Sequence, residues 1–329
     1  MVTLDRIRRA RERIGHRVHH TPLLSSQTLG RRVGGHAFLK AECLQRTGSF
    51  KARGALNKVD SLSAAEKARG LIAVSAGNHA QAVAFAATEA GARSTVVMPE
   101  TAPRSKVEAS RRYGAQVILH GSVFDAFDRC EQLRREMGYT FVHPFEDEDV
   151  IAGQGTVALE ILDDLLDPDV IVVPVGGGGL ISGIAAATKA LRPTTRVIGV
   201  EPTGAACVTA ALAAGEAVDL DTVETIADGL ATPHTGPIAL AHIRQLVDEI
   251  VLVTDEELAD AIVFTLERAK LMLEPAGAAA VAALVAGRIA IDPGAHVVAV
   301  LSGGNIDLAK LAALLPEEEA LEKYGPMKA

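Results

Sequence analysis

The residues best suited to chemistry lie in short loops that combine glycine with hydroxyl, amide or amine side chains. Four of these glycines are consecutive, Gly176, Gly177, Gly178 and Gly179, and stand between an apolar segment and a helical one. Glycine lets the backbone approach an anion closely, and free N–H groups at a helix start carry partial positive charge. A flexible turn would gain nothing from a run that costs so much conformational entropy. We therefore expect the run to hold a phosphate.

The glycine run lacks the marks of the common nucleotide motifs. No Lys-Ser or Lys-Thr pair follows it, and Ile181 and Ser182 occupy the place of the third glycine of GxGxxG. A nucleoside triphosphate site is therefore excluded. Glu201 ends the next apolar segment, where a ribose-binding acid stands in a dinucleotide fold, so an NAD-dependent oxidoreductase stays open as an alternative.

Three more loops join polar side chains to glycine: Ser75-Ala76-Gly77-Asn78-His79, Thr47-Gly48-Ser49-Phe50-Lys51 and Ser302-Gly303-Gly304-Asn305. Each could be no more than a turn with a helix cap. Ser and Asn side chains and N–H groups at a helix start, however, also suit a carboxylate or a ring hydroxyl. A lysine is usually solvated, but a desolvated one can act as an amine nucleophile. Together with the phosphate loop, Lys51 favours a phosphate-bearing aldehyde cofactor.

These loops lie between segments whose pattern predicts alternating strands and helices. Such alternation is typical of βαβ units and a largely parallel sheet, and ligands bind beyond the carboxyl ends of its strands. We expect strands at 70–75, 94–99, 115–120, 139–144, 170–175, 196–201, 249–254 and 296–301. We expect helices at 79–91, 104–114, 123–137, 150–166 and 180–191.

The segments predict an α/β protein with two doubly wound domains and mainly parallel sheets. We expect a small, substrate-side domain at 66–145. The first fifty residues contain no complete lobe, so we expect them to join a discontinuous large, cofactor-binding domain made of 1–65 and 146–329. The acidic run 146–149 is expected to be a solvated loop, and 316–329 a frayed helical tail.

Composition excludes several classes of protein. A chain of 329 residues with a net charge of −8 and no tryptophan offers no basic or stacking surface for nucleic acid or for an anionic membrane. No apolar run approaches the ~20 residues of a membrane span, and the charged start predicts an amphipathic helix rather than a signal peptide. The 3 cysteines form no CxxC pair, which indicates reduced thiols. We expect a cytoplasmic protein that binds a small molecule, and neither nucleic acid nor a membrane as a partner.

Taken together, the motifs resemble the serine/threonine dehydratase and serine racemase family of pyridoxal-phosphate enzymes, which have fold type II, the tryptophan synthase β-like fold. The resemblance runs from Thr21 to the SGGN loop and covers nearly the whole chain. The motifs occur in family order: GSFKARGA, SAGNHAQ, VIAGQGT, GGGGLISG, TIADG, EPAGA and LSGGNIDLAK.

The resemblance implies pyridoxal 5'-phosphate as the cofactor and assigns a role to each loop. Lys51 would form the imine with the cofactor aldehyde, and Phe50 would pack on the ring. Asn78 would contact the ring hydroxyl, Ser302 would face the pyridine nitrogen, and the glycine run would hold the phosphate. The substrate-binding residues that it implies are Ser75, Ala76, Gly77, His79, Asp228 and Gly229.

The implied activity is β-elimination, which converts L-threonine and/or L-serine to a 2-oxo acid and ammonia. The Lys51 amine, once freed by the incoming substrate, would take the α-proton. A serine racemase or a hydroxyaspartate dehydratase of the same family stays open, as do an NAD-dependent oxidoreductase and a catalytically silent amino-acid sensor. The racemase branch has a serine where this sequence has Ala76, which favours the dehydratase. Family analogy favours a homodimer, and we expect no regulatory domain after the SGGN helix.

Some family members bind a divalent cation at positions that correspond here to Glu201, Ala205 and Cys207. A thiol is a poor ligand for hard magnesium or calcium, so we expect no metal there. His16, His19 and His20 are expected on one face of the first helix, where exposure is a better explanation than metal binding.

Overall fold

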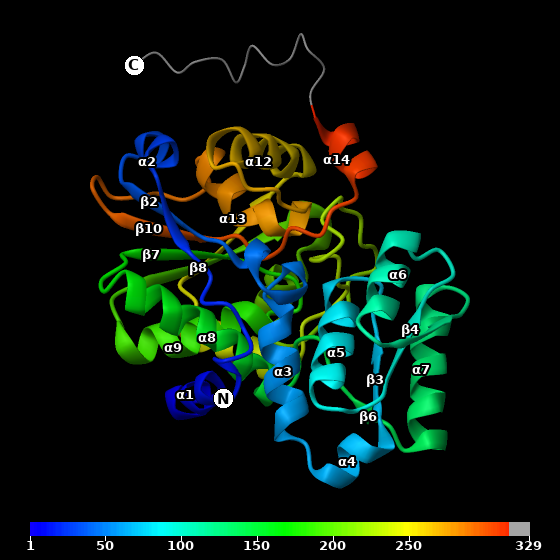
Figure 1. The fold of residues 1–329 in the computed structure, drawn as a ribbon. Helices are drawn as coiled ribbons and strands as arrows, with labels where there is room; N and C mark the ends of the chain where they lie inside the picture. Colours follow the sequence, from blue (N-terminus) through cyan, green and yellow to red (C-terminus); the bar gives the residue numbers. More distant parts are fainter. Residues whose placement is uncertain (316–329) are drawn as a thin grey trace.

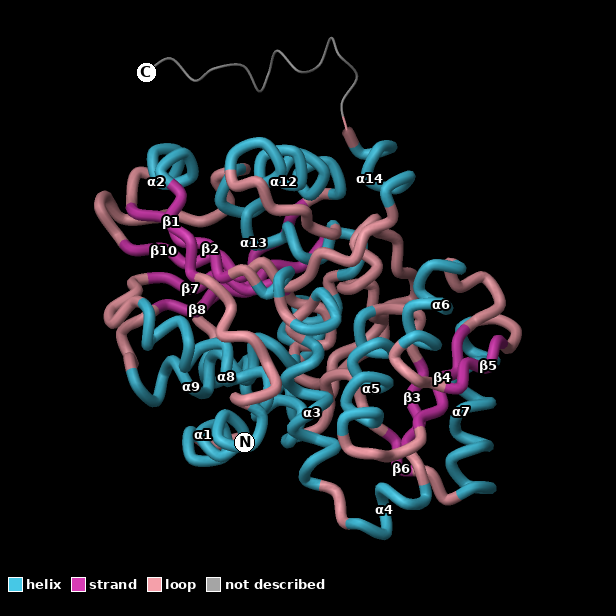
Figure 2. The backbone as a smooth tube through the Cα atoms, in the orientation of Figure 1, coloured by secondary structure: helices cyan, strands magenta, loops and turns pink. Residues whose placement is uncertain are grey.

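The computed structural model describes residues 1–315, and in this range the strands form two separate sheets (Figures 1 and 2). The larger sheet contains β1 (Leu23–Ser26), β2 (His36–Lys40), β7 (Val170–Pro174), β8 (Arg196–Pro202), β9 (Glu249–Val253) and β10 (His296–Val300). The smaller sheet contains β3 (Leu71–Val74), β4 (Ser94–Met98), β5 (Gln116–Leu119) and β6 (Thr140–Phe141). The strand orders are β1-β2-β10-β7-β8-β9 and β5-β4-β3-β6.

The predicted fold class is confirmed, because both sheets are mainly parallel. Every neighbouring pair runs parallel except β1 and β2, which are antiparallel at the edge of the larger sheet. β2 pairs with β10, although the two strands lie near opposite ends of the chain. The early strands therefore complete the sheet that carries the glycine run.

Helices flank both sheets (Figure 1). Their bounds are α1 (Leu4–Ile14), α2 (Gln27–Val33), α3 (Lys51–Ser61), α4 (Ala64–Arg69), α5 (Asn78–Glu89), α6 (Arg104–Arg112), α7 (Val123–Met137), α8 (Glu148–Asp164), α9 (Gly179–Leu191), α10 (Cys207–Ala214), α11 (Pro237–Leu246), α12 (Asp255–Arg268), α13 (Pro275–Val285) and α14 (Leu308–Leu314). Short 3-10 turns are η1 (Glu42–Leu44), η2 (Arg46–Gly48) and η3 (Thr203–Ala205).

The larger sheet is buried on both faces. Along β7, Val170 and Val172 belong to the core that includes α12 and α13, whereas Ile171 and Val173 belong to the core that includes α8 and α9. Successive side chains of a strand point to opposite faces, so a strand covered by helices on both sides must be apolar throughout. That requirement explains the unbroken VIVVP run of β7.

The smaller sheet is covered in the same way. Leu71 and Ala73 of β3 pack with α5, while Ile72 between them packs with Ala126 and Cys130 of α7. α6 covers the same face as α5, through Val107.

Helix α3 lies between the two layers and packs against both α8 and α5. A Cβ at Gly153 of α8 would lie 2.7 Å from the Cα of Gly54 of α3, so glycines allow these two helices to approach closely. Because α3 packs against helices beside both sheets, it does not mark a boundary between domains. The division into a large domain of 1–65 and 146–329 and a small domain of 66–145 stays a proposal.

The structure corrects two local predictions, and one falls outside its range. The acidic run is no solvated loop, because Glu146 accepts hydrogen bonds from the first N–H groups of α11 and Asp147 caps α8. Helix α1 ends at Ile14, so the three histidines share no helical face. The predicted tail at 316–329 lies outside the described residues. None of the described helices combines the length and apolarity that crossing a membrane requires.

Candidate active site

A cavity of about 530 Å³ lies where loops from the two sheets meet. Its lining includes every residue that the sequence assigned to a cofactor or substrate: Phe50, Lys51, Ser75, Ala76, Gly77, Asn78, His79, Gly176, Gly177, Gly178, Gly179, Asp228, Gly229 and Ser302. Most of these residues follow β3, β7 or β10; Phe50 and Lys51 lie at the start of α3, and Asp228 and Gly229 lie between α10 and α11. The fold therefore brings together loops that are far apart in the chain. Their individual roles stay predictions.

The glycine run forms the turn between β7 and α9. Gly178 caps the helix with φ 89°, a left-handed conformation that side chains rarely adopt. A Cβ at Gly177 would fall 2.4 Å from the ring of Phe145, so that position also excludes a side chain. Thr235 donates to the carbonyl of Gly177 and helps to fix the turn. The N–H groups of the first helical turn have no intrahelical partner, so the cradle suits an anion such as phosphate.

Lys51 is the first residue of α3 and reaches into the cavity. Its Nζ donates a 2.8 Å hydrogen bond to the carbonyl of Pro144. Burial lowers the pKa of Lys51 to about 8, and Glu274 only partly opposes this effect. A substantial share of the amine is therefore neutral near pH 8, which is the form that attacks an aldehyde.

Asn78 belongs to a chain of polar side chains beside the cavity. Asn305 donates to the Asn78 Oδ1 at 2.8 Å and to the carbonyl of Thr47 at 2.7 Å. The Asn78 Nδ2 in turn donates to Glu274 at 2.5 Å. This chain connects the SAGNHAQ, SGGN and EPAGA loops with the loop that precedes Lys51.

Glu274 is a residue of this site that the sequence did not reveal. It is 8% exposed, and burial raises its pKa to about 7 although the hydrogen bond from Asn78 opposes the rise. The EPAGA motif contains it, but an acid before a helix is usually an exposed cap, and nothing local distinguishes a buried one. Lys106 and Phe145 also line the cavity without a local signal that would have identified them.

Three other polar residues of the cavity already have partners. Ser75 Oγ accepts a hydrogen bond from Gly77 N at 3.1 Å, and Ser302 Oγ donates to the Ala276 carbonyl at 3.3 Å. His79 Nε2 lies 2.7 Å from the carbonyl of Val142, while burial and the nearby Lys51 lower its pKa to about 3. The imidazole is therefore neutral and turned away, so we infer that His79 can offer a ligand its backbone N–H rather than its ring.

Asp228 lies at the margin of the cavity. It is paired with Lys106 at 3.4 Å and with Lys310 at 2.9 Å. The first contact joins α6, beside the smaller sheet, to the loop that precedes α11. Asp228 thus links the two layers across the cavity margin.

At the positions where some family members bind a cation, the side chains of Glu201 and Cys207 contact other parts of the protein. Glu201 is fully buried and accepts bonds from the N–H groups of Val208 and Thr209 and from the Thr209 hydroxyl. Cys207 Sγ lies 3.6 Å from the Gly176 carbonyl, and burial, with Glu201 nearby, raises its pKa to about 12. A protonated thiol does not fit a hard cation. Glu201 is also directed inward, so it does not offer a carboxylate to a ribose.

The histidines near the N-terminus take part in ordinary surface contacts. His19 Nδ1 lies 3.0 Å from the carbonyl of Leu44, and His20 Nε2 lies 3.0 Å from Asp164. Across residues 1–315, no group of three or more His, Cys, Asp or Glu residues is arranged to hold a metal ion.

The mainly parallel fold, the anion cradle and the reactive lysine define an enzyme of the pyridoxal-phosphate class. Comparison with known proteins agrees. The chain belongs to the family described as "Pyridoxal-phosphate dependent enzyme", whose model matches residues 14–303.

Named relatives place the chain more closely within the family. It is 48% identical over 326 residues to L-threonine ammonia-lyase of Thermotoga maritima, which covers 99% of this chain and 80% of that protein. It is 43% identical to the catabolic L-threonine dehydratase TdcB of Escherichia coli, over 95% of this chain and 96% of that protein. The structure of maize serine racemase superimposes with a TM-score of 0.91 at 37% identity, covering 98% of this chain and 99% of that one.

Proposed function

We propose that this enzyme is an L-threonine ammonia-lyase that also accepts L-serine and releases a 2-oxo acid and ammonia. Of the relatives quoted above, the two with the highest identities are named L-threonine ammonia-lyase and catabolic L-threonine dehydratase. The observation that carries the proposal is the position of Lys51, whose amine opens into the same cavity as the glycine cradle. An amine nucleophile and a phosphate cradle on one cavity are what a phosphate-bearing aldehyde requires.

The residues present fit pyridoxal phosphate. The cradle is too tight for any side chain at Gly177, so it admits an anion only through backbone N–H groups. Gly176 to Gly179 would hold the phosphate, Phe50 would pack on the ring, and Asn78 and Ser302 would contact its polar atoms. When bound, the cofactor supplies an aldehyde for the amine and an electron-accepting ring.

The chain itself supplies orientation and proton transfer. Ser75 and the N–H groups of Ala76, Gly77 and His79 would hold the substrate carboxylate, while Asp228 and Gly229 would border its side chain. Lys51 would take the α-proton, because it is the amine in the cavity with a lowered pKa. Breaking the Cα–H and Cβ–O bonds releases one water, and hydrolysis of the resulting enamine consumes one water and yields the 2-oxo acid and ammonia.

The test is a spectrum of the purified enzyme followed by product analysis. The expected result is absorbance near the violet edge of the visible range, together with equal amounts of ammonia and 2-oxo acid from L-threonine. D-serine formed from L-serine as fast as pyruvate would favour the racemase. Binding of NAD with no violet absorbance would favour the oxidoreductase, and amino-acid binding without ammonia would favour the sensor. Faster turnover of 3-hydroxyaspartate would favour the hydroxyaspartate dehydratase.

We also propose that the enzyme acts in the cytoplasm on a small hydroxy amino acid and that it functions as a homodimer. It needs no divalent cation, because Cys207 stands where a hard cation would require an oxygen ligand.

A further inference from the structure

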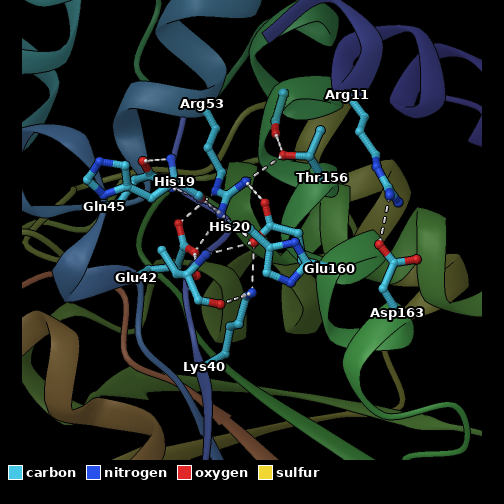
Figure 3. A network of polar contacts seen from close by, with 12 residues as sticks. Arg11, His19, His20, Lys40, Glu42, Gln45, Arg53, Thr156, Glu160 and Asp163 are labelled. Atoms are coloured by element: carbon cyan, nitrogen blue, oxygen red, sulfur yellow. Dashed lines mark hydrogen bonds and ion pairs between the residues drawn. The ribbon is translucent and has the colours of Figure 1, made fainter. Parts of the chain in front are cut away.

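A cluster of charged side chains is buried directly beneath the first turn of α3 (Figure 3). We call it the Arg53 network; it consists of Lys40, Glu42, Arg53 and Glu160. Lys40, Glu42 and Arg53 are each 0% exposed, and Glu160 is 6% exposed. Two cations and two carboxylates therefore balance in the interior of the protein.

The guanidinium of Arg53 is divided between the two carboxylates. Its Nε and Nη2 donate to Glu42 at 2.7 and 2.8 Å, and its Nη1 and Nη2 donate to Glu160 at 2.6 and 2.8 Å. Lys40 Nζ also donates to Glu160, at 2.7 Å. Burial by itself would lower the pKa of Arg53, but the two carboxylates raise it above its ordinary value, so the group stays charged.

The network joins elements that are distant in the sequence. Lys40 ends β2, Glu42 begins η1, Glu160 lies on α8, and Arg53 lies on α3. A buried ion cluster is weak evidence for stability, since apolar residues of similar volume are often as stable. It does fix geometry, because a guanidinium can satisfy two carboxylates at once in few orientations.

Other contacts also hold the first turn of α3: the Phe50 N–H donates to the carbonyl of Ser302, and Gly54 packs closely on Gly153 of α8. Phe50, at the N-cap, provides no side-chain cap. The neighbouring Gly54 N–H donates to the side chain of Gln154 on α8, on the same side of the helix as the network. Arg53 is two residues from Lys51, so whatever fixes Arg53 also fixes the backbone from which the amine extends.

We propose that Arg53 is a positioning residue for Lys51, and that its network holds the first turn of α3 against β2 and α8 so that the amine stays at the cofactor cavity. The inference rests on the proposed function, in which Lys51 bonds to the cofactor aldehyde. Arg53 itself does not line the cavity.

The groups around Lys51 define what a shift of this turn would change. The amine faces the Pro144 carbonyl, Glu274 before α13, His79 on α5 and His143 after β6. Neither histidine is positively charged near neutral pH. The pKa of His79 is lowered to about 3 and that of His143 to about 4, first by burial and next by the nearby Lys51. An amine released toward water would regain a higher pKa and would capture the aldehyde more slowly at neutral pH.

The test compares two charge-balanced double variants of the cofactor-free protein. R53M/E42Q removes one cation and one anion of the network and leaves Lys40 with Glu160. The matched control, R17M/D60N, removes the Arg17–Asp60 ion pair at the opposite end of the same helix. Pyridoxal phosphate is added at pH 6 to 10, the rise in absorbance gives the rate of bonding to Lys51, and hydrogen exchange of residues 51–57 is followed by mass spectrometry.

We expect R53M/E42Q to bond at least tenfold more slowly at pH 7.5, with a pH midpoint above that of the parent and faster hydrogen exchange in the first turn of α3. The control should stay within twofold of the parent in rate and keep its midpoint. If R53M/E42Q is folded but its rate and midpoint match the parent, the inference is wrong.

If R53M/E42Q fails to fold, Arg53→Lys decides the question, because an ammonium cannot bond to both carboxylates as a guanidinium does. The same changes in rate, midpoint and hydrogen exchange are then expected at smaller size, and their absence overturns the inference. A parent protein that shows no absorbance change would contradict the proposed function instead.

Discussion

Lys51 and Arg53 stand two residues apart in the first turn of α3, and both are cations withdrawn from water. Arg53 meets two carboxylates and stays charged. Lys51 meets a carbonyl, and burial lowers its pKa to about 8. The same helical turn thus carries one cation that is fully compensated and one that is not.

The difference shows that burial alone does not determine what a charged residue does. Desolvation disfavours the charged form of both groups, and the partners decide whether the charge survives. Where carboxylates compensate it, the side chain fixes geometry. Where they do not, the group releases its proton and becomes available as a nucleophile and base.

The largest effect is expected for Lys51→Ala. Turnover should disappear, because the variant lacks the amine that is proposed to bond to the cofactor. The cofactor-free variant should be at least as stable as the parent below pH 8. The folded parent keeps Lys51 deprotonated between its folded pKa of about 8 and its ordinary value of 10.5, where the unfolded chain is protonated. Stability of the parent therefore rises with pH in that window, and the advantage of the variant should shrink there. Thermal unfolding at several pH values tests this, and more than trace activity would refute the role of Lys51.

Glu160→Gln removes one of the two carboxylates that compensate the charge of Arg53. Removing one partner leaves Lys40 without its carboxylate and Arg53 with only Glu42, so the free energy of unfolding should fall by about 3 to 5 kcal/mol. Asp163→Asn on the same helix removes the exposed pair with Arg11 and should cost less than about 1 kcal/mol. Urea unfolding of both variants measures the contrast, and equal losses would show that the network is no more than a surface-like interaction.

Glu274→Gln removes the buried carboxyl group whose charge acts on Lys51. The folded pKa of about 7 exceeds the ordinary 4.5, so between these values the native state holds a proton that the unfolded chain has lost. Parent stability should therefore fall as pH rises from 4.5 through 7, and the glutamine variant should lack that decline. Melting temperatures of the cofactor-free proteins at pH 5 and 7.5 provide the test. The same decline in both proteins would place the titrating group elsewhere.

Ala76→Ser should have the smallest effect. Inverting an amino acid requires a second proton-transfer group besides Lys51, and Ala76 on the cavity wall has no exchangeable proton. Ser75 has a hydroxyl, but in the proposed function that hydroxyl holds the substrate carboxylate. The variant should form some D-serine from L-serine, well below its rate of ammonia release, whereas the parent should form almost none. Chiral chromatography decides it, and rapid D-serine formation by the parent would point to another proton donor.

Most of the site could be predicted because its residues are carried by glycine-rich loops with unusual local chemistry. The glycine run and the SGGN loop follow strands of the larger sheet, and the SAGNHAQ loop follows a strand of the smaller one. Parallel strands place such loops beyond the carboxyl ends of their own sheet. Glu274 could not be predicted, since its raised pKa comes from burial by residues distant in the sequence rather than from the EPAGA motif. The acidic run shows the same limit, because Glu146 meets the start of α11 only in the folded chain.

The amino-acid sequence specifies the alternation of strands and helices, the parallel architecture, and the loops that carry Lys51 and the glycine run. These features depend on periodicity and on local backbone freedom, which neighbouring residues specify. Which charges are compensated depends on packing. Glu42 and Glu160 reach Arg53 from elements far apart in the chain, whereas the Lys51 Nζ donates to a carbonyl and to no carboxylate, so packing sets the chemistry of two cations that are two residues apart.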